Sequence, residues 1–218
     1  FLDEYPKIES VVNILQPGQE GGNAVADVLC GKKTPSGKLA DSWAMDYNDY
    51  PSAATFSFKS GDVFHEEYKE GIYVGYRYFD TFDVPVRYGF GFGLSYTTFF
   101  IKTQKVTVSN LDSENPVLTT EVEVTNTGVI YSGKEVVQIF VSCPQGSRVK
   151  EYRRLAGFAK TKELAPGEKQ SLSITFPLYQ LTSYEEETAS WVLDGGNYGI
   201  WVGNSLSDAK LCAVLSLD

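Results

Sequence analysis

The chain has 218 residues, of which 42% are hydrophobic, 14% aromatic and 22% charged, a composition typical of a globular protein that can bury one or two cores. Its 28 acidic and 19 basic residues give a formal charge of −9, so nucleic-acid and membrane partners are not expected. No run approaches the roughly 20 continuous apolar residues that a membrane helix requires.

The first fifty residues have the pattern of an α/β domain. An apolar run at residues 11–15 predicts a buried strand, and residues 17–22, rich in Pro and Gly, follow it as a turn. Residues 23–30 have apolar side chains at helical spacing, and Gly31 stands where a helix end favours a left-handed residue. Residues 38–43 predict a short extended segment. One strand and one helix cannot cover each other's apolar faces, so this part is expected to be a fragment of a larger layered domain.

Residues 44–97 are dense in Tyr, Phe, Gly and Asp and have little regular periodicity. A flexible linker would be rich in Gly and Ser or in Pro and poor in aromatic residues. We therefore expect an ordered connector that is held by burial of its rings against other surfaces. The glycines of residues 89–93 lack the order of a dinucleotide-binding motif and are better explained as structural glycines that permit aromatic packing.

Beyond residue 97 the chain alternates apolar and polar residues between turn signals. Strands are predicted at residues 98–108, 119–125, 135–141, 154–161, 171–176, 190–193, 198–202 and 209–217. This number of short strands is typical of a two-sheet antiparallel sandwich of the immunoglobulin or fibronectin type III kind. Trp191 and Trp201 lie at alternating positions in two of these strands, which predicts that both rings are in the core.

The sequence contains few candidates for chemistry. His65, Glu66 and Glu67 could contribute two ligands to a metal ion, but adjacent residues rarely converge on one ion, which favours a solvated loop. Glu20, in the turn before the predicted helix, either faces a ligand site or, as we prefer, interacts favourably with the helix dipole. No metal and no cofactor are expected.

Other charged and sulfur-containing residues are interpreted as structural. The acidic run at residues 185–187 predicts an exposed turn, and the basic residues at 148–154 predict a surface or interdomain contact. Cys30, Cys143 and Cys212 are widely spaced and odd in number, which favours buried free thiols over a disulfide framework or a zinc site.

Five motifs in chain order carry a family resemblance. They are PGQEGGNA at 17–24, DVLCG at 27–31, PSGKL at 35–39, EGIYVGYRYFD at 70–80 and YGFGFGLSYTTF at 88–99. Together they closely resemble the C-terminal half of the glycoside hydrolase family 3 β-glucosidases. Four later stretches resemble the fibronectin type III-like domain that many of these enzymes carry, namely VTNTG at 124–128, GKEVVQ at 133–138, LAGFAKT at 155–161 and LAPGE at 164–168.

The resemblance implies a mainly β fold with three parts. Residues 1–43 would be the C-terminal fragment of an α/β sandwich domain, residues 44–97 the aromatic-rich connector, and residues 98–218 a fibronectin type III-like antiparallel β-sandwich. Binding residues tend to lie on long ordered loops, so the loop around His65, Glu66 and Tyr68 is expected to approach the outer sugar-binding region, although no family motif falls on it.

The same resemblance implies that the chain holds neither catalytic carboxylate. In the family a (β/α)8 barrel supplies the nucleophile and the α/β sandwich domain the acid/base, in a double displacement that needs two carboxyl groups about 5 Å apart. Asp41-Ser42-Trp43 does not match the nucleophile motif, and the acid/base would precede Phe1. The chain would be scaffold for a β-glucosidase or β-xylosidase. Its partners would be the missing barrel, the rest of the α/β domain and a β-glycoside substrate, and the isolated chain would be inactive.

Two alternatives belong to other classes. One is a non-catalytic carbohydrate-binding or adhesive β-sandwich module, against which the predicted burial of Trp191 and Trp201 argues; the other is a protein-interaction sandwich. A homo-oligomer is compatible with either. Free cysteines and the lack of an N-x-[ST] motif favour a bacterial cytoplasmic protein over a secreted one.

Overall fold

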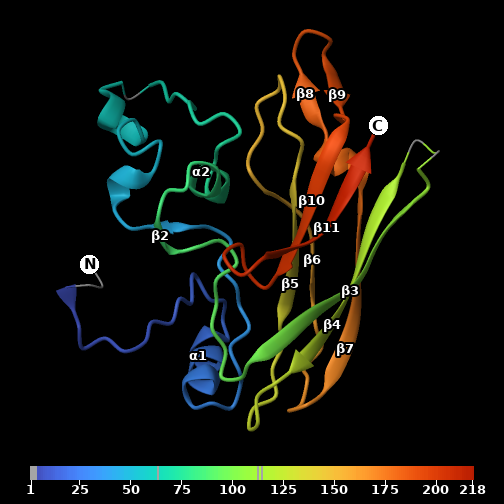
Figure 1. Cartoon of the computed structure of the whole chain (residues 1–218). Coiled ribbons are helices and arrows are strands. Elements are labelled where there is room, and N and C mark those ends of the chain that lie inside the picture. The colour runs from blue at the N-terminus through green and yellow to red at the C-terminus, as the bar shows by residue number, and fades with distance from the viewer. Residues whose placement is uncertain (1–3, 63, 112, 114) are drawn as a thin grey trace.

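The computed structural model describes residues 4–62, 64–111, 113 and 115–218, and two antiparallel sheets form its largest part (Figure 1). One sheet has the strand order β11-β10-β5-β6 and the other β3-β4-β7. Their strands are β3 (Phe99–Ser109), β4 (Val117–Asn126), β5 (Val136–Ser142), β6 (Arg154–Lys160), β7 (Lys169–Pro177), β10 (Gly196–Gly203) and β11 (Lys210–Leu217). The mainly β fold and the antiparallel sandwich predicted from the alternation are confirmed.

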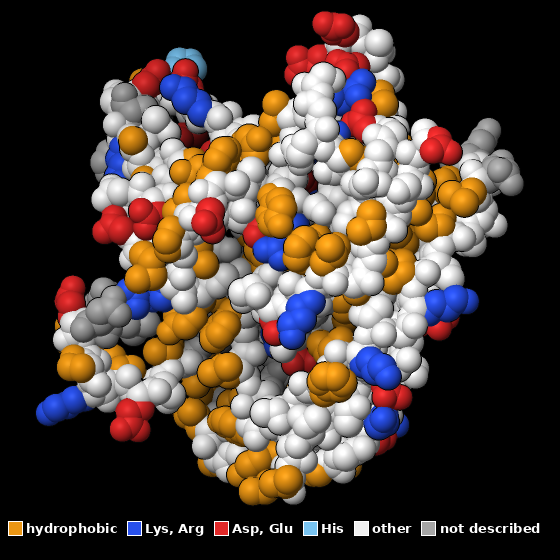
Figure 2. All heavy atoms as spheres, viewed as in Figure 1, with side chains coloured by type: hydrophobic (Ala, Val, Ile, Leu, Met, Phe, Trp, Pro, Cys, Tyr) orange, Lys and Arg blue, Asp and Glu red, His pale blue; other side chains and the backbone are white. Residues whose placement is uncertain are grey.

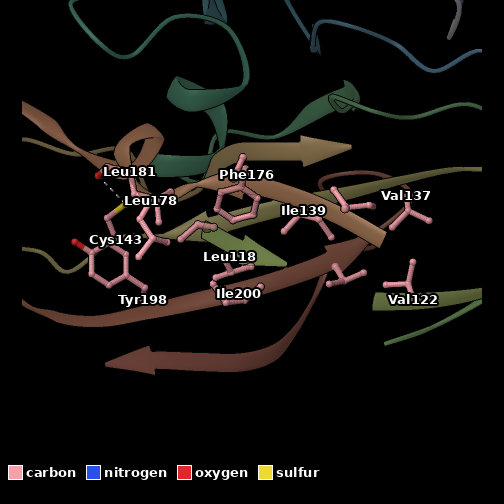
Figure 3. Packing of buried hydrophobic residues seen from close by; sticks show 14 of the residues in the cluster. Leu118, Val122, Val137, Ile139, Cys143, Phe176, Leu178, Leu181, Tyr198 and Ile200 are labelled. Carbon is pink, nitrogen blue, oxygen red and sulfur yellow. Dashed lines mark hydrogen bonds between the residues drawn. The ribbon is translucent and has the colours of Figure 1, made fainter. Parts of the chain in front are cut away.

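The main core lies between the two sheets. Along β4 every second side chain is buried, because alternate residues of a strand point to the same face. Leu118 and Val122 of β4 meet Ile139 of β5, Phe176 of β7 and Ile200 of β10 there (Figure 3). All eight predicted strands are present with shifted ends, the sixth of them as β9 (Ser190–Val192) in a separate hairpin.

Strand β5 is buried on both faces, unlike its neighbours. Val137, Ile139 and Val141 point into the main core, whereas Phe140 points out of the sandwich into a second, smaller cluster. Partly buried residues that pack on this cluster include Tyr76 and Phe90. The outer face of the four-stranded sheet is therefore covered by the segment that precedes the sandwich.

That preceding segment contains only short elements. They are α1 (Gly21–Leu29), β1 (Trp43–Ala44), η2 (Tyr47–Asp49), η3 (Ser57–Ser60), α2 (Tyr76–Thr81) and β2 (Val86–Tyr88), with β1 paired to β2. None of the described helices is both long enough and apolar enough to cross a membrane. The helix predicted at residues 23–30 is confirmed as α1, and Gly31 follows it with a φ of +73°.

The strand predicted at residues 11–15 is wrong. These residues have no regular secondary structure, and their apolar side chains are exposed. An extended segment becomes a strand only when a neighbouring strand satisfies its backbone hydrogen-bonding groups. Among the residues that the structure describes, no strand lies beside this segment.

The prediction that both tryptophans are core rings is wrong for Trp191. This residue lies on β9, which pairs only with β8 (Ser183–Glu185), and its side chain is exposed because the hairpin stands outside the two sheets (Figure 1). Trp201 of β10 is half-buried against the Phe140 cluster. Glu186 and Glu187 lie in the exposed turn that the acidic run predicts.

The prediction of three buried thiols holds only for Cys143. Burial raises the pKa of its thiol, whose sulfur lies 3.9 Å from the carbonyl oxygen of Leu181 (Figure 3). Cys30 caps the end of α1 and Cys212 lies on the edge strand β11, and both are exposed. A residue at a helix end or on an edge strand has fewer neighbours to cover it.

Replacing Phe140 by alanine should lower the free energy of unfolding by about 3 to 5 kcal/mol, because a fully buried aromatic ring is removed from between two layers. Urea unfolding followed by circular dichroism measures the loss. Phe100→Ala, on an exposed face of β3, is the control and should change stability by about 0.5 kcal/mol or less. A similar small effect for both variants would contradict the described packing.

Candidate functional site

Aromatic rings join the connector to the outer face of the four-stranded sheet. The ring centroid of Tyr76 lies 4.6 Å from that of Phe90, and both rings lie 6.2 Å from Phe140. The hydroxyl of Tyr76 also accepts a 2.8 Å hydrogen bond from the backbone N–H of Leu155 at the start of β6. Each such ring pair contributes about 0.5 to 1.5 kcal/mol beyond its buried area, so the contact fixes α2 against the sheet.

A buried ion pair lies beside these rings. Two guanidinium nitrogens of Arg153 donate hydrogen bonds to the carboxylate of Asp80 in α2. The hydrogen bond from Nε to Oδ2 is 3.0 Å long, and Nη2 donates to Oδ1. The two side chains are only 11% and 9% exposed. The guanidinium also donates to the carbonyl of Leu206 and lies 5.1 Å from the ring centre of Trp201. The predicted contact role of the basic residues is confirmed for Arg153.

A second buried pair joins three separate parts of the chain. Lys38 Nζ lies 2.9 Å from Glu135 Oε1 and donates to the carbonyl of Gly93. The other oxygen of Glu135 accepts from the side-chain amide of Asn204 at 3.0 Å. The segment after α1, the glycine-rich stretch and the sandwich therefore share one network.

Within the sandwich, Arg154 holds Glu151 in a third pair, with 2.6 Å between Nε and Oε1. Burial by itself would raise the pKa of the Glu151 carboxyl, but the hydrogen bond and the positive charge of Arg154 outweigh it and leave the pKa lowered. Arg154 also donates to the carbonyls of Gln180 and Thr182. It thereby fixes η4 (Leu178–Leu181) and the start of β8.

Gly91 and Gly93 serve close packing, although the groups nearest to them are not the aromatic rings that the sequence predicts, and Gly89 has only an ordinary contact. Gly91 has a φ of +80°, and a Cβ atom there would lie 2.4 Å from the side-chain nitrogen of Gln138. A Cβ on Gly93 would lie 2.2 Å from the carbonyl oxygen of Gly37. A larger side chain at position 91 would push the connector away from β5, and one at position 93 would push it away from the segment after α1.

The predicted site residues His65, Glu66 and Tyr68 lie together on an exposed loop, with Tyr68 91% exposed. His65 Nδ1 lies 2.7 Å from Asp62 Oδ2, and hydrogen bonds from the Phe64 N–H and from His65 lower the pKa of the Asp62 carboxyl. In the part of the chain that the structure describes, no three His, Cys, Asp or Glu residues are placed to hold a metal ion. The loop is exposed to solvent in the structure.

Glu20 occupies the N-cap position of α1, and its carboxylate accepts a hydrogen bond from the Asn23 side chain instead of capping the backbone. The side chain is exposed. This position at the helix N-terminus agrees with the preferred interpretation of Glu20.

Two surface grooves lack the groups that glycoside hydrolysis requires. One, of about 560 Å³, lies between the edges of β6 and β7 and is lined by neutral residues of these strands. The other, of about 420 Å³, has Lys33, Lys134 and Lys160 on its walls and Glu163 as its one lining acid. Neither groove therefore offers the carboxyl pair of a glycosidase.

Many large apolar side chains are exposed in the N-terminal segment and the connector, among charged and polar ones. Exposed large apolar residues there are Tyr5, Ile8, Val11, Val12, Ile14, Leu15, Phe56, Phe64, Tyr68, Val74 and Phe82. Orange side chains crowd the part of the surface over α1 and the connector (Figure 2). Large apolar side chains left exposed in such number along one part of the chain are typical of a surface that another surface covers.

Sequence reasoning did not identify Tyr76 and Asp80 as the residues that anchor the connector. A signal was present, because residues four apart on a helix share one face. Their partners are more than 70 residues away in sequence, at Arg153 and Leu155. The residues near Tyr76 and Asp80 in the sequence do not indicate those partners.

Asp80→Asn should lower the free energy of unfolding by about 3 kcal/mol, since it leaves the buried Arg153 charge without its counter-ion. Urea unfolding measures this loss. Glu123→Gln breaks the exposed pair with Lys169 and is the matched control, with an expected cost of about 1 kcal/mol or less. If Asp80→Asn costs no more than the control, the pair does not anchor the connector.

Comparison with known proteins places the chain in a family. Residues 2–76 match the glycosyl hydrolase family 3 C-terminal domain, and residues 135–206 match the fibronectin type III-like domain. β-Glucosidase A of Butyrivibrio fibrisolvens is 41% identical over 94% of this chain and 26% of its own length. A β-glucosidase crystal structure from Paenibacillus barengoltzii is 44% identical, with a TM-score of 0.82 over 88% of this chain and 21% of that one.

β-Glucosidase 3B of Thermotoga neapolitana, solved with glucose, is 39% identical with a TM-score of 0.82, over 92% of this chain and 27% of that one. The chain spans about a quarter of the length of the curated relatives it matches. These matches cover both the segment around α1 and the sandwich. The chain belongs to glycoside hydrolase family 3, of which it represents a C-terminal segment.

Proposed function

We propose that the chain is the C-terminal scaffold of a retaining β-glucosidase and that both catalytic carboxylates lie outside these 218 residues. Residues 1–43 serve as the end of an α/β sandwich domain, residues 44–97 as the connector and residues 98–218 as the fibronectin type III-like domain. The (β/α)8 barrel and the rest of the α/β domain are the partners, and a β-glucoside is the substrate.

The observation that carries the proposal is the exposed apolar face of the first 30 residues and the connector. Ile8, Val11, Val12 and Ile14 are each about half exposed in a segment without strand partners. Such a sequence gains stability only when another surface covers it. The rest of an α/β domain would supply both the neighbouring strands and the covering layer.

The choice of a glucoside follows the relatives. Proteins named β-glucosidase from bacteria and fungi share 32% to 41% identity with nearly all of the chain. A Bifidobacterium longum relative, 36% identical, is named exo-alpha-(1->6)-L-arabinopyranosidase. Relatives of different specificity thus share this segment, and the sugar preference is set mainly by the barrel.

The isolated chain should show no hydrolysis of an aryl β-glucoside above background, because double displacement requires both carboxyl groups. The matched experiment places this chain in the Paenibacillus barengoltzii β-glucosidase instead of its corresponding segment. That chimera should hydrolyse the substrate. Turnover by the isolated chain, or a folded chimera without activity, would contradict the proposal.

The loop at residues 65–68 is proposed to form an outer wall of the sugar-binding site. In the chimera, His65→Ala, Glu66→Gln and Tyr68→Ala should each raise KM about threefold to tenfold with little change in kcat, as expected for the loss of one binding contact. Phe100→Ala, on the sandwich, is the control and should leave both constants unchanged. Unchanged KM in all three variants would remove the loop from the site.

A further inference from the structure

The β8–β9 hairpin carries an exposed aromatic cluster that the scaffold role does not use. Tyr184 of β8 and Trp191 of β9 are direct cross-strand partners, so their rings share one face, with centroids 5.3 Å apart. Tyr179 of η4 adds a third ring 6.3 Å from Trp191. These three residues are here called the hairpin cluster. Tyr179 is 60% exposed, Tyr184 50% and Trp191 58%.

The hairpin cluster is held by the body of the sandwich. Arg154 donates to the carbonyls of Gln180 and Thr182, between Tyr179 and Tyr184. The Thr182 hydroxyl donates to the carbonyl of Tyr179 at 2.7 Å, and Arg148 lies 2.8 Å from Glu185. A surface that is ordered before binding avoids part of the entropy cost of binding.

Two carboxylates lie in the turn that joins the strands of this hairpin. Glu186 and Glu187 lie in the turn between β8 and β9, exposed and without an ion pair to any described residue. Acidic side chains gather over the tip of this hairpin (Figure 2). Each ionised carboxylate can accept several hydrogen bonds and donates none. Glu186 and Glu187 therefore favour a ligand that is rich in hydrogen-bond donors.

We propose that the hairpin cluster is a non-catalytic binding site for a β-linked glucan chain. The C–H face of one glucose ring stacks on Trp191, and a neighbouring glucose contacts Tyr184, whose ring is inclined by 64° to that of Trp191. The glucan hydroxyls donate to Glu186 and Glu187. The choice of a β-glucan rests on the proposed function, whereas the binding of a neutral polyhydroxylated chain rests on the cluster itself. Negative charge at the tip and the net charge of −9 disfavour anionic lipids and nucleic acids.

Affinity electrophoresis of the 218-residue chain tests the site. Soluble mixed-linkage β-glucan in a native gel should retard the chain, whereas dextran should not. Trp191→Ala and Tyr184→Ala should each weaken the retardation about tenfold in apparent Kd. Phe100→Ala removes a ring that is also 58% exposed but lies on β3, and should bind like the unsubstituted chain.

Circular dichroism should show that Trp191→Ala folds normally, because the ring is not part of either core cluster. Absence of retardation, or retardation that Trp191→Ala leaves unchanged, would overturn the site. Equal retardation by dextran that is lost in Trp191→Ala would overturn the choice of a β-linked glucan. Sedimentation showing a dimer that depends on Trp191 and excludes glucan would assign the face to a second copy instead.

Binding and hydrolysis are separable outcomes. Trp191→Ala in the chimera should leave kcat on an aryl β-glucoside unchanged, since the cluster is proposed to bind glucan apart from the catalytic site. Retardation of the chain together with an inactive chimera would sink the proposed function and keep the glucan site. An active chimera, together with no retardation of the chain by β-glucan, would keep the proposed function and overturn the glucan site.

Discussion

The structure depends on covering the outer face of β5. An antiparallel strand normally has one solvent-exposed face, so its sequence alternates apolar and polar residues. In β5 the run Val136–Ser142 is apolar at nearly every position, and Phe140 would expose a whole ring if the connector were absent. Tyr76 and Phe90 cover the Phe140 ring, and this packing places Asp80 next to Arg153. Sandwich and connector are consequently one packed body.

This packing explains how much the sequence could predict. Period-two alternation predicted most strands of the sandwich because they have one buried face, in contrast to β5, which is buried on both. Gly31 predicted the end of α1 because glycine adopts a positive φ at low cost. The same patterns misplaced residues 11–15 and Trp191. A pattern states that a side chain is apolar, and whether it is covered depends on what lies beside it.

Polar contacts between residues far apart in the chain could not be predicted from the sequence either. Asn126 is fully buried and donates to the carbonyls of Tyr131 and Leu164, and its side-chain oxygen accepts from the Thr97 hydroxyl at 2.6 Å. The sequence identified residues 124–128 only as a stretch that resembles the fibronectin type III-like domain. The candidate loop at His65 could be found from its residue types, because an imidazole beside carboxylates stands out in a chain with one histidine. The Asp62 contact needed the structure.

The central claim is that connector and sandwich form one body whose apolar outer face receives the rest of the enzyme. Hydrogen exchange of the isolated chain and of the chimera, read by mass spectrometry, tests it most directly. We expect α2 and β2 to be protected in both proteins, and residues 8–15 to exchange freely alone but slowly in the chimera. Rapid exchange of α2 in the isolated chain, or free exchange of residues 8–15 in both, would contradict the account.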